Sequence, residues 1–373
     1  MDIETRLELI KRNTAEILTE TELRAALETG IPLRHYIGFE ISGPIHLGTG
    51  LVCMSKVRDF QRAKASCSLF LADWHSWINE KLGGDLETIQ RVAKAYFAEG
   101  LKACLEALGG NSEKIKVVLG SKLYHANDDY WRTVIDIAKH STLGRVKRSI
   151  TILGREAREK VNFAMLIYPV MQVADIFAQG INLAHAGLDQ RKAHVIARDV
   201  ALKLRTPLRH KGRPFKPIAV HHPLLLGLQT PPIWPIPTDR LRQLWTAQKM
   251  SKSVPGSAIA ITDSPDEIKA KLGAAFCPAR ETAFNPVLNW VKALVFAEPG
   301  AELEIVREKR WGGPISFSSY ADLEAAFAAG QLHPLDLKAA LADFLIKVLE
   351  PVRKAFSRPA LARAARELAE LTR

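Results

Sequence analysis

Cysteine is scarce in this chain, and long hydrophobic runs are missing. Its four cysteines, Cys53, Cys67, Cys104 and Cys277, are scattered over 373 residues without a C-x-x-C pair. This spacing argues against a zinc site and against a disulfide framework, and it fits a reducing cytoplasm. Because no run of about 18 apolar residues occurs, we expect no membrane-spanning helix. The mixed-charge N-terminus reads as an amphipathic helix and not as a signal peptide.

Acidic residues are outnumbered by basic ones. The chain has 52 lysines and arginines against 40 aspartates and glutamates, a formal net charge of +12 at pH 7. This excess favours a polyanionic partner, although ribosomal, nucleic-acid-binding and ATP-binding proteins all share it. The length, with a hydrophobic content of 47%, indicates a globular protein with two or more domains.

A glycine-rich turn near the N-terminus is the first candidate site. An apolar strand is predicted at residues 35–39, and a Ser-Gly-Pro turn follows it. His46, Gly48 and Thr49 then precede an apolar run, 51–60, that reads as a helix. Free backbone N–H groups and the helix dipole favour an anion at such a helix start, and glycine lets it approach closely. Taken alone, the motif also fits a tight strand–helix turn with a surface histidine.

A second motif lies about 200 residues downstream. Residues 249–253 read Lys-Met-Ser-Lys-Ser, and Pro-Gly follows two positions later. Two lysines and two hydroxyl side chains on a flexible loop predict a mobile clamp for phosphate groups.

Short apolar runs alternate with helical patterns over most of the chain. Besides the first strand, the runs that we predict as strands are 67–72, 115–119, 183–186 and 217–221. This alternation implies an α/β fold with a doubly wound parallel sheet. Residues 2–28 predict two helices before the first strand. Helical patterns dominate again after about residue 260, which marks a domain boundary.

One predicted helix carries a polar stripe. Tyr168, Gln172 and Asp175 are spaced i, i+4 and i+7, so they share one face of a helix that we expect to begin near Tyr168. Burying a carboxylate and an amide without partners is costly. The three side chains could satisfy one another in the core, but a bound ligand provides the partner more economically. Asp189 and Gln190 follow the next strand, at the sheet edge where ligands bind in such folds.

The pair formed by the H-x-G turn and the K-M-S-K-S loop resembles the class I aminoacyl-tRNA synthetases. From about residue 5 to residue 355, the remaining motifs resemble the archaeal and eukaryotic tyrosyl-tRNA synthetases. The resemblance implies a Rossmann-like catalytic domain at 1–260, with a basic helical connective insertion at about 121–164 and the lysine loop at 249–253. A helical anticodon-binding domain at 261–373 would follow. The proline-rich stretch 224–248 falls outside the resemblance, and we assign no catalytic or binding role to it.

The resemblance also assigns roles to individual residues. Thr49 stands where the family usually has a second histidine, so it can donate a hydrogen bond but carries no charge. Expected catalytic residues are His46, Lys249 and Lys252. ATP would contact Gly48, Thr49, Asp189, Met250, Ser251 and Ser253. Tyrosine would contact Tyr36, Phe70, His75, Tyr168, Gln172, Asp175 and Gln190. The tRNA would contact Arg191, Trp311, His333 and Asp336.

The implied reaction is that of a tyrosine–tRNA ligase: tyrosine and ATP form tyrosyl-adenylate, and the tyrosyl group passes to the 3′ end of tRNA(Tyr). Mg²⁺ is expected to accompany ATP, with no zinc and no protein metal ligands. A cytoplasmic homodimer without a membrane partner is expected.

Two alternatives remain open from the sequence. The same scaffold could select tryptophan, although Asp175 suits a phenol better than an indole. The chain could also be a non-catalytic tRNA-binding paralogue, against which the intact His46, Lys249 and Lys252 argue. In addition, His333 with Pro334 could be a plain helix start instead of an anticodon contact.

Overall fold

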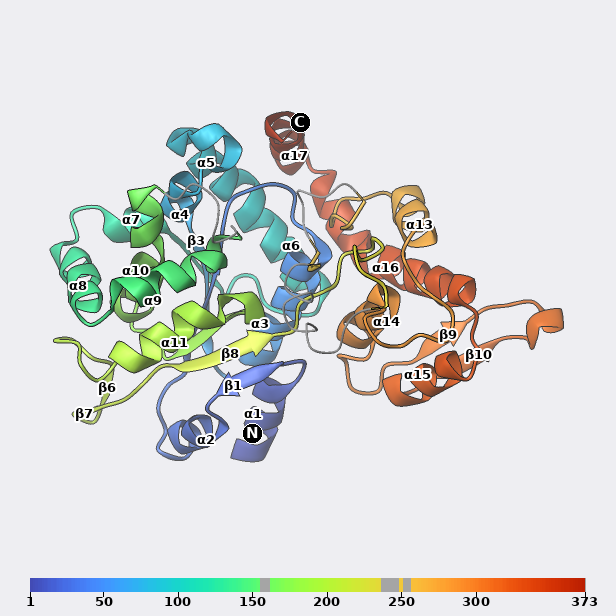
Figure 1. Ribbon diagram of the computed structural model, residues 1–373, viewed down its shortest axis with the longest axis horizontal. Coiled ribbons are helices and arrows are strands. Elements are labelled where there is room, and N and C mark those ends of the chain that lie inside the picture. Colours follow the sequence, from blue (N-terminus) through green and yellow to red (C-terminus); the bar gives the residue numbers. More distant parts are fainter. Residues whose placement is uncertain (155–161, 236–247, 251–255, 373) are drawn as a thin grey trace.

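The computed structural model describes residues 1–154, 162–235, 248–250 and 256–372. Three predicted site residues, Ser251, Lys252 and Ser253, lie outside the described residues, as do 236–247 of the proline-rich stretch. A central sheet packed with helices forms one part of the molecule, and a mostly helical C-terminal region lies beside it (Figure 1).

The central sheet has six strands: β1 (Glu16–Leu18), β2 (Arg34–Phe39), β3 (Ser66–Leu71), β4 (Lys116–Leu119), β5 (Leu183–Gly187) and β8 (Ile218–His222). Their order is β1-β8-β5-β2-β3-β4, and all neighbours are parallel except β1, which joins the edge antiparallel to β8. The predicted doubly wound parallel sheet is therefore confirmed. Its strand order reverses between β2 and β5, where ligands bind in folds of this kind.

Each face of the sheet packs against its own apolar core. Ile37 and Leu69 belong to the cluster on one face, whereas their strand neighbours Tyr36 and Phe70 belong to the cluster on the other. Side chains alternate across a strand, so this division follows from the pleat. The covering helices are α1 (Ile3–Lys11), α2 (Glu20–Glu28), α3 (Cys53–Arg62), α5 (Leu86–Val92), α6 (Glu99–Ala107), α8 (Asp128–Lys139), α10 (Phe163–Ala178) and α11 (Arg191–Val200).

The short elements of this part are helices α4 (Asp73–Ile78), α7 (Gly120–Tyr124) and α9 (Leu143–Ser149), and strands β6 (Arg209–His210) and β7 (Arg213–Pro214). The expected helical insertion is thus seen as α8 and α9, although residues 155–161 lie outside the described ranges.

Two predictions of element boundaries were wrong. Residues 2–28 contain strand β1 between the two expected helices. Three residues are too few to show a strand pattern, and pairing with β8 decides their conformation. Helix α10 begins at Phe163 instead of near Tyr168, because the Asn162 side chain caps it by accepting from the N–H of Met165. Pro169 therefore lies inside the helix.

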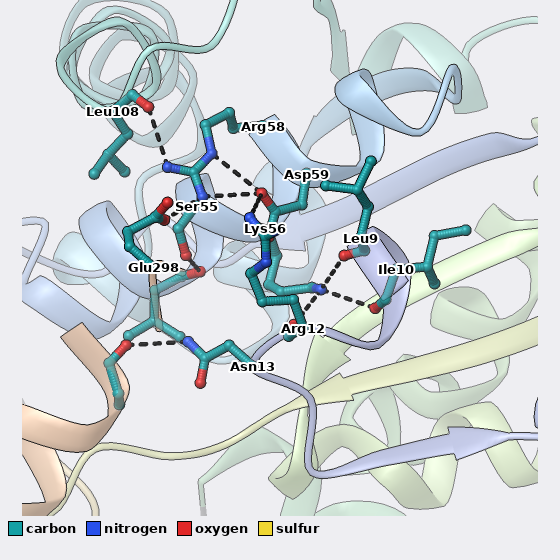
Figure 2. A network of polar contacts seen from close by, with 12 residues as sticks. Leu9, Ile10, Arg12, Asn13, Ser55, Lys56, Arg58, Asp59, Leu108 and Glu298 are labelled. Carbon is teal, nitrogen blue, oxygen red and sulfur yellow. Dashed lines mark hydrogen bonds and ion pairs between the residues drawn. The ribbon is translucent and has the colours of Figure 1, made fainter. Parts of the chain in front are cut away.

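A buried polar network connects the end of helix α1 to the rest of the molecule (Figure 2). Lys56 of α3 is fully buried, and its Nζ donates to the carbonyl oxygens of Leu9, Ile10 and Arg12 at 3.3, 2.8 and 2.5 Å. These carbonyls belong to the end of α1, which a cation stabilises. Arg58 of the same helix pairs with Glu298 of the C-terminal region. Helix α3 thus holds both flanking segments.

The C-terminal region is mostly helical, as predicted. It contains α13 (Pro265–Gly273), α14 (Pro286–Trp290), α15 (Tyr320–Ala328), α16 (Pro334–Phe356) and α17 (Pro359–Leu371), with a small sheet of β9 (Leu303–Ile305) and β10 (Ile315–Phe317). One apolar cluster contains residues from Leu7 to Leu368 and so includes both sides of the expected boundary near residue 260. That domain boundary stays a prediction. Among the described helices, none is long and apolar enough to cross a membrane.

Candidate active site

A cavity of about 400 Å³ opens where the parallel strands end. Thirteen of the predicted site residues line this single cavity: Tyr36, His46, Gly48, Thr49, Phe70, His75, Tyr168, Gln172, Asp175, Asp189, Gln190, Lys249 and Met250. They come from β2, the turn before α3, β3, α4, α10, the turn after β5, and the lysine motif. The structure therefore brings the early histidine and the distant lysine into one site.

Asp175 lies at the dry end of this cavity. Its side chain is 2% exposed. Tyr124 and Tyr130 donate to its Oδ1 at 3.0 and 3.1 Å. Burial raises the pKa of Asp175 well above its ordinary value, and the two hydrogen bonds oppose that rise. Because both tyrosines use Oδ1, Oδ2 is the oxygen left for a hydroxyl group of a ligand.

Aromatic rings form the walls around Asp175. Burial, together with the charge of Asp175, raises the pKa of Tyr36, so its hydroxyl stays a donor. Burial lowers the pKa of His75 to about 3, so this imidazole stays neutral. His75 Nε2 lies 3.7 Å from Asp175 Oδ2, and its ring packs edge-on against Tyr168 at a centroid distance of 4.4 Å. This end of the cavity therefore suits a ring with a polar tip.

A cluster of amides lies one helical turn before Asp175. Gln172 Nε2 donates to Gln190 Oε1 at 3.2 Å, and Gln190 Nε2 donates to the Ile152 carbonyl at 3.0 Å. Gln172 Oε1 is buried and has no hydrogen-bond partner within the described part of the chain. A buried acceptor without a partner is costly, so this oxygen suits a donor such as an ammonium group.

His46 and Thr49 also line the cavity, and their side chains face each other. Thr49 Oγ1 lies 3.4 Å from His46 Nε2, and the Thr49 N–H donates to His46 Nδ1 at 3.4 Å. A Cβ at Gly48 would lie 3.0 Å from the His46 ring. The imidazole lies directly beside Gly48, and the expected contact of Gly48 with ATP stays a prediction. A larger residue would displace His46.

Asp189 and Lys249 form an ion pair across the site. Their Oδ2 and Nζ atoms are 2.5 Å apart. Burial alone would raise the pKa of Asp189, but the Lys249 ammonium group, with smaller contributions from Gln190 and His222, holds that pKa below its ordinary value. Asp189 is thus a carboxylate already engaged by a cation. A nucleotide ribose would share it with Lys249.

The segments on both sides of residues 251–255 are hydrogen-bonded to the part of the molecule that contains the central sheet. The Met250 N–H donates to the Leu225 carbonyl at 2.7 Å, and the Met250 side chain is 5% exposed within the core. On the other side, the Ile261 N–H donates to the Ile45 carbonyl at 2.9 Å, and the Leu47 N–H donates to the Ile259 carbonyl at 3.1 Å. The second attachment lies directly beside His46.

The residues predicted to contact tRNA lie outside the cavity. Arg191 is exposed at the start of α11, where its Nε donates to Glu16 at 2.8 Å. Trp311 is 65% exposed. His333 caps α16, accepting at Nδ1 from the Leu335 N–H at 3.2 Å. His333 and Pro334 therefore begin a helix, and the anticodon contact of His333 stays a prediction. Asp336 lies in the first turn of the same helix.

Sequence reasoning missed several residues of the site. Tyr124 and Tyr130 come from the connective insertion, and no local pattern links them to Asp175. Three further buried histidines, His185, His194 and His222, also line the cavity. His222 directly follows the predicted end of its strand, a position where polar residues point to a ligand edge. Across the described ranges, no group of three or more histidine, cysteine, aspartate or glutamate side chains could hold a metal ion.

Comparison with known proteins gives consistent matches. The family model described as tRNA synthetases class I (W and Y) matches residues 28–350. A tyrosine–tRNA ligase of Pyrococcus furiosus is 57% identical over 361 residues, which are 96% of each chain. The Thermococcus kodakarensis enzyme of the same name is 56% identical over 361 residues, again 96% of each chain.

A solved structure matches equally well. The tyrosyl-tRNA synthetase of Pyrococcus horikoshii, crystallised with L-tyrosine, superposes with a TM-score of 0.96 at 54% identity. The alignment covers 98% of this chain and 100% of that one.

Proposed function

The chain belongs to the class I tRNA synthetases (W and Y), and we propose that it is a tyrosine–tRNA ligase. It activates tyrosine with ATP and transfers the tyrosyl group to the 3′ end of tRNA(Tyr). The observation that carries this function is the shared cavity, whose lining includes Asp175 and Tyr36 together with His46 and Lys249. Archaeal relatives at 55–57% identity bear the same name, so the tryptophan-specific and non-catalytic alternatives are not retained.

In our assignment, the dry end binds the amino acid. Tyr36 donates a hydrogen bond to the phenolic oxygen of tyrosine, and the phenolic O–H of tyrosine donates to Asp175 Oδ2. Phe70 and His75 flank the ring. The α-ammonium group then donates to Gln172 Oε1, with Tyr168 and Gln190 beside it. Phenylalanine would leave the Tyr36 hydroxyl and the Asp175 carboxyl unpaired, which is the physical basis of its rejection.

The other end performs the phosphoryl chemistry. The tyrosine carboxylate attacks the α-phosphate of ATP, and pyrophosphate leaves. His46 and Thr49 donate hydrogen bonds to the phosphate as its geometry changes, while Lys249 and Lys252 neutralise charge on the leaving pyrophosphate. Met250, Ser251 and Ser253 complete the clamp, and Asp189 accepts from ribose hydroxyls. Mg²⁺ bound to ATP would neutralise charge on the phosphates, and Asp189, which is already paired with Lys249, would not be needed as its ligand.

Two surfaces serve the tRNA in this assignment. Arg191 lies next to Gln190, where the acceptor end must enter. In the C-terminal region, Arg307 donates to the carbonyls of Gly313 and Gln331 at 2.7 and 2.8 Å. This side chain joins the turn that carries Trp311 to the segment that leads into His333 and Asp336. An exposed indole and a carboxylate held together suit an unstacked anticodon base.

A cytoplasmic homodimer completes the proposal. Large apolar side chains are exposed on and around the connective insertion: Ile135 at 61%, Leu143 at 60% and Phe163 at 77%. A second subunit would cover them. All four cysteines are free thiols, which suits a reducing compartment. Light scattering in solution tests the dimer.

Amino-acid-dependent ATP–pyrophosphate exchange tests the function. Tyrosine should support exchange in the absence of tRNA, whereas tryptophan and phenylalanine should not at the same concentration. Exchange supported by tryptophan and not by tyrosine would overturn the assignment of Asp175. Binding of tRNA without any release of pyrophosphate would instead favour a non-catalytic protein.

A further inference from the structure

The most basic segment outside the cavity is the hairpin that follows α11. Residues 203–216 contain six lysines and arginines and no aspartate or glutamate. The six are Lys203, Arg205, Arg209, Lys211, Arg213 and Lys216. The whole chain has 52 basic and 40 acidic residues, an excess of 12, so this short segment accounts for half of it.

These cations face solvent without acidic partners. All but Lys216 are exposed, and Lys216 is half-buried. None of the ion pairs formed between described residues involves any of the six. Cations on the neighbouring helices differ: Arg145 of α9 pairs with Asp199, and Arg198 of α11 pairs with Glu22. The arginines of these two helices thus form ion pairs, whereas the six cations of the hairpin form none with described residues.

The tip of the hairpin holds a lysine in an unfavourable conformation. Lys211 has a φ of 47° and Gly212 a φ of 79°, the pattern of a two-residue turn with both central residues in the left-handed region. Asparagine or glycine suits the first of these positions. A lysine there costs on the order of 1 kcal/mol. The turn therefore carries a charge where folding alone favours a different residue.

The base of the hairpin is fixed to the apolar core. Leu208 is 9% exposed, and Phe215 packs against the same cluster as α10 and α11. The Phe215 N–H donates to the Leu208 carbonyl at 3.0 Å, and Arg198 donates to the Pro217 carbonyl at 2.8 Å. From this base the β6–β7 hairpin projects beyond the body at the lower left of the molecule (Figure 1). An anchored base presents the charged tip in a defined direction.

Helix α11 connects this hairpin to the active site. Gln190, which lines the cavity, immediately precedes α11, and the ten residues of the helix span about 15 Å. Exposed cations lie at both ends: Arg191 and Lys192 at the start, Lys203 and Arg205 just past the end. A double-stranded RNA stem that enters the cavity with its single-stranded end presents phosphates over a similar length. Proteins recognise such stems mainly through backbone phosphates and shape.

We propose that the 203–216 hairpin binds the phosphate backbone of the tRNA substrate at a distance from the cavity. This inference rests on the proposed function, because it names a second contact for the same substrate. The contact adds affinity and orientation without reading sequence, since the side chains involved are cations on an exposed tip. It takes no part in tyrosine activation, which needs no tRNA.

The test uses a triple variant, Arg209→Gln, Lys211→Gln and Arg213→Gln, with a matched control. The control, Lys94→Gln, Lys114→Gln and Lys116→Gln, removes the same charge from exposed positions that include the opposite edge of the sheet. The affinity of each variant for tRNA is measured between 50 and 200 mM salt, roughly the range over which phosphate contacts weaken strongly. Tyrosine-dependent pyrophosphate exchange without tRNA is measured in parallel.

We expect the hairpin variant to bind tRNA at least about tenfold more weakly at low salt, with the slope of log affinity against log salt smaller by about 2 to 3. Exchange should equal that of the control. If tRNA affinity and its salt slope match those of the control, the hairpin proposal is overturned while the proposed function stands. Absence of tyrosine-dependent exchange in the unmodified protein would overturn both.

A single substitution separates charge from folding. Lys211→Asn places a residue that suits the turn at the tip, so thermal stability should be unchanged or higher. The tRNA affinity should nevertheless fall and the salt slope decrease by about 1. Unchanged affinity in this variant would contradict a role for the tip cation.

Discussion

The two ends of the cavity are built differently. At the amino-acid end, Asp175 is 2% exposed and receives hydrogen bonds from Tyr124 and Tyr130, so every partner comes from a regular helix or its immediate flank. At the nucleotide end, Asp189 and Lys249 are 14% and 33% exposed; Asp189 lies in a three-residue 3₁₀ helix after β5, and Lys249 forms an isolated bridge with Leu226. The first end is a preformed pocket for recognition. The second end includes Lys249 of the lysine motif, and the described residues on both sides of 251–255 hydrogen-bond to the body.

This difference suggests a division of labour. A buried pocket can discriminate among amino acids because unpaired polar groups are costly there. A more exposed site that contains Lys249 can stabilise the charge that develops on the leaving pyrophosphate. Changes at the first end should therefore affect binding and selectivity, and changes at the second end should affect the rate of the chemical step.

The largest effect is expected at the nucleotide end. Lys249→Ala removes a cation from the leaving pyrophosphate and leaves Asp189 buried without its partner. The rate constant for adenylate formation should fall about 100- to 1,000-fold. Rapid-quench measurement of pyrophosphate release in a single turnover checks this. Lys249→Arg, which retains the charge, is the control and should lose less; equal losses would show that charge is not what Lys249 contributes.

At the amino-acid end, Asp175→Ala should be nearly as damaging for tyrosine. It removes an acceptor from Tyr124, from Tyr130 and from the substrate hydroxyl, so kcat/KM for tyrosine should fall about 100-fold, or about 3 kcal/mol. The ratio of tyrosine to phenylalanine exchange should shrink with it. If that ratio stays constant while both activities fall, the carboxyl supports the fold but not the selection.

The buried His75 should make the free energy of unfolding depend on pH. Burial lowers the pKa of His75 to about 3, against an ordinary value of 6.5. Below pH 6.5, His75 is therefore protonated in the unfolded chain but stays neutral in the folded chain until the pH approaches 3. The contribution of the neutral His75 to the free energy of unfolding is therefore fully present above pH 6.5, and it is lost as the pH falls toward 3. Between pH 7.5 and 5.5 the loss is about 1.4 kcal/mol.

His75→Gln cannot titrate, so its free energy of unfolding should fall by about 1.4 kcal/mol less than that of the unmodified protein over this interval. Urea unfolding at the two pH values measures the difference. Parallel pH dependence in both proteins would mean that His75 is not held neutral by the fold.

The smallest effect concerns a residue behind Asp175. Tyr124→Phe deletes one of the two hydroxyls that position the carboxyl, which should weaken tyrosine binding by about tenfold, or about 1 to 1.5 kcal/mol. Isothermal calorimetry measures the Kd. Lys122→Gln, on the exposed side of the same short helix, serves as a control that should leave the Kd unchanged.

Local patterns were enough to predict the sheet and much of the site. The i, i+4, i+7 spacing placed Tyr168, Gln172 and Asp175 on one helical face, and all three line the cavity. Strand ends predicted where Asp189 and Gln190 would lie, because parallel strands end at a common edge. The ligand explanation of the polar stripe is supported by the unpartnered Gln172 Oε1.

Contacts between distant segments were not predictable in this way. Tyr124 and Tyr130 lie 51 and 45 positions before Asp175, and the packing of α8 on α10, with α7 beside α8, brings them together. The pairing of Lys249 with Asp189 spans 60 positions. β1 was missed because its strand conformation comes from β8. In each case, the information lies in the tertiary arrangement and not in a local period.

The division between the two ends is tested most directly by measuring the tyrosine Kd and the single-turnover rate of adenylate formation in Tyr124→Phe and Lys249→Ala side by side. The account predicts that Tyr124→Phe raises the Kd with little change in the rate, and that Lys249→Ala lowers the rate with little change in the Kd. Equal changes of both quantities in both variants would contradict it.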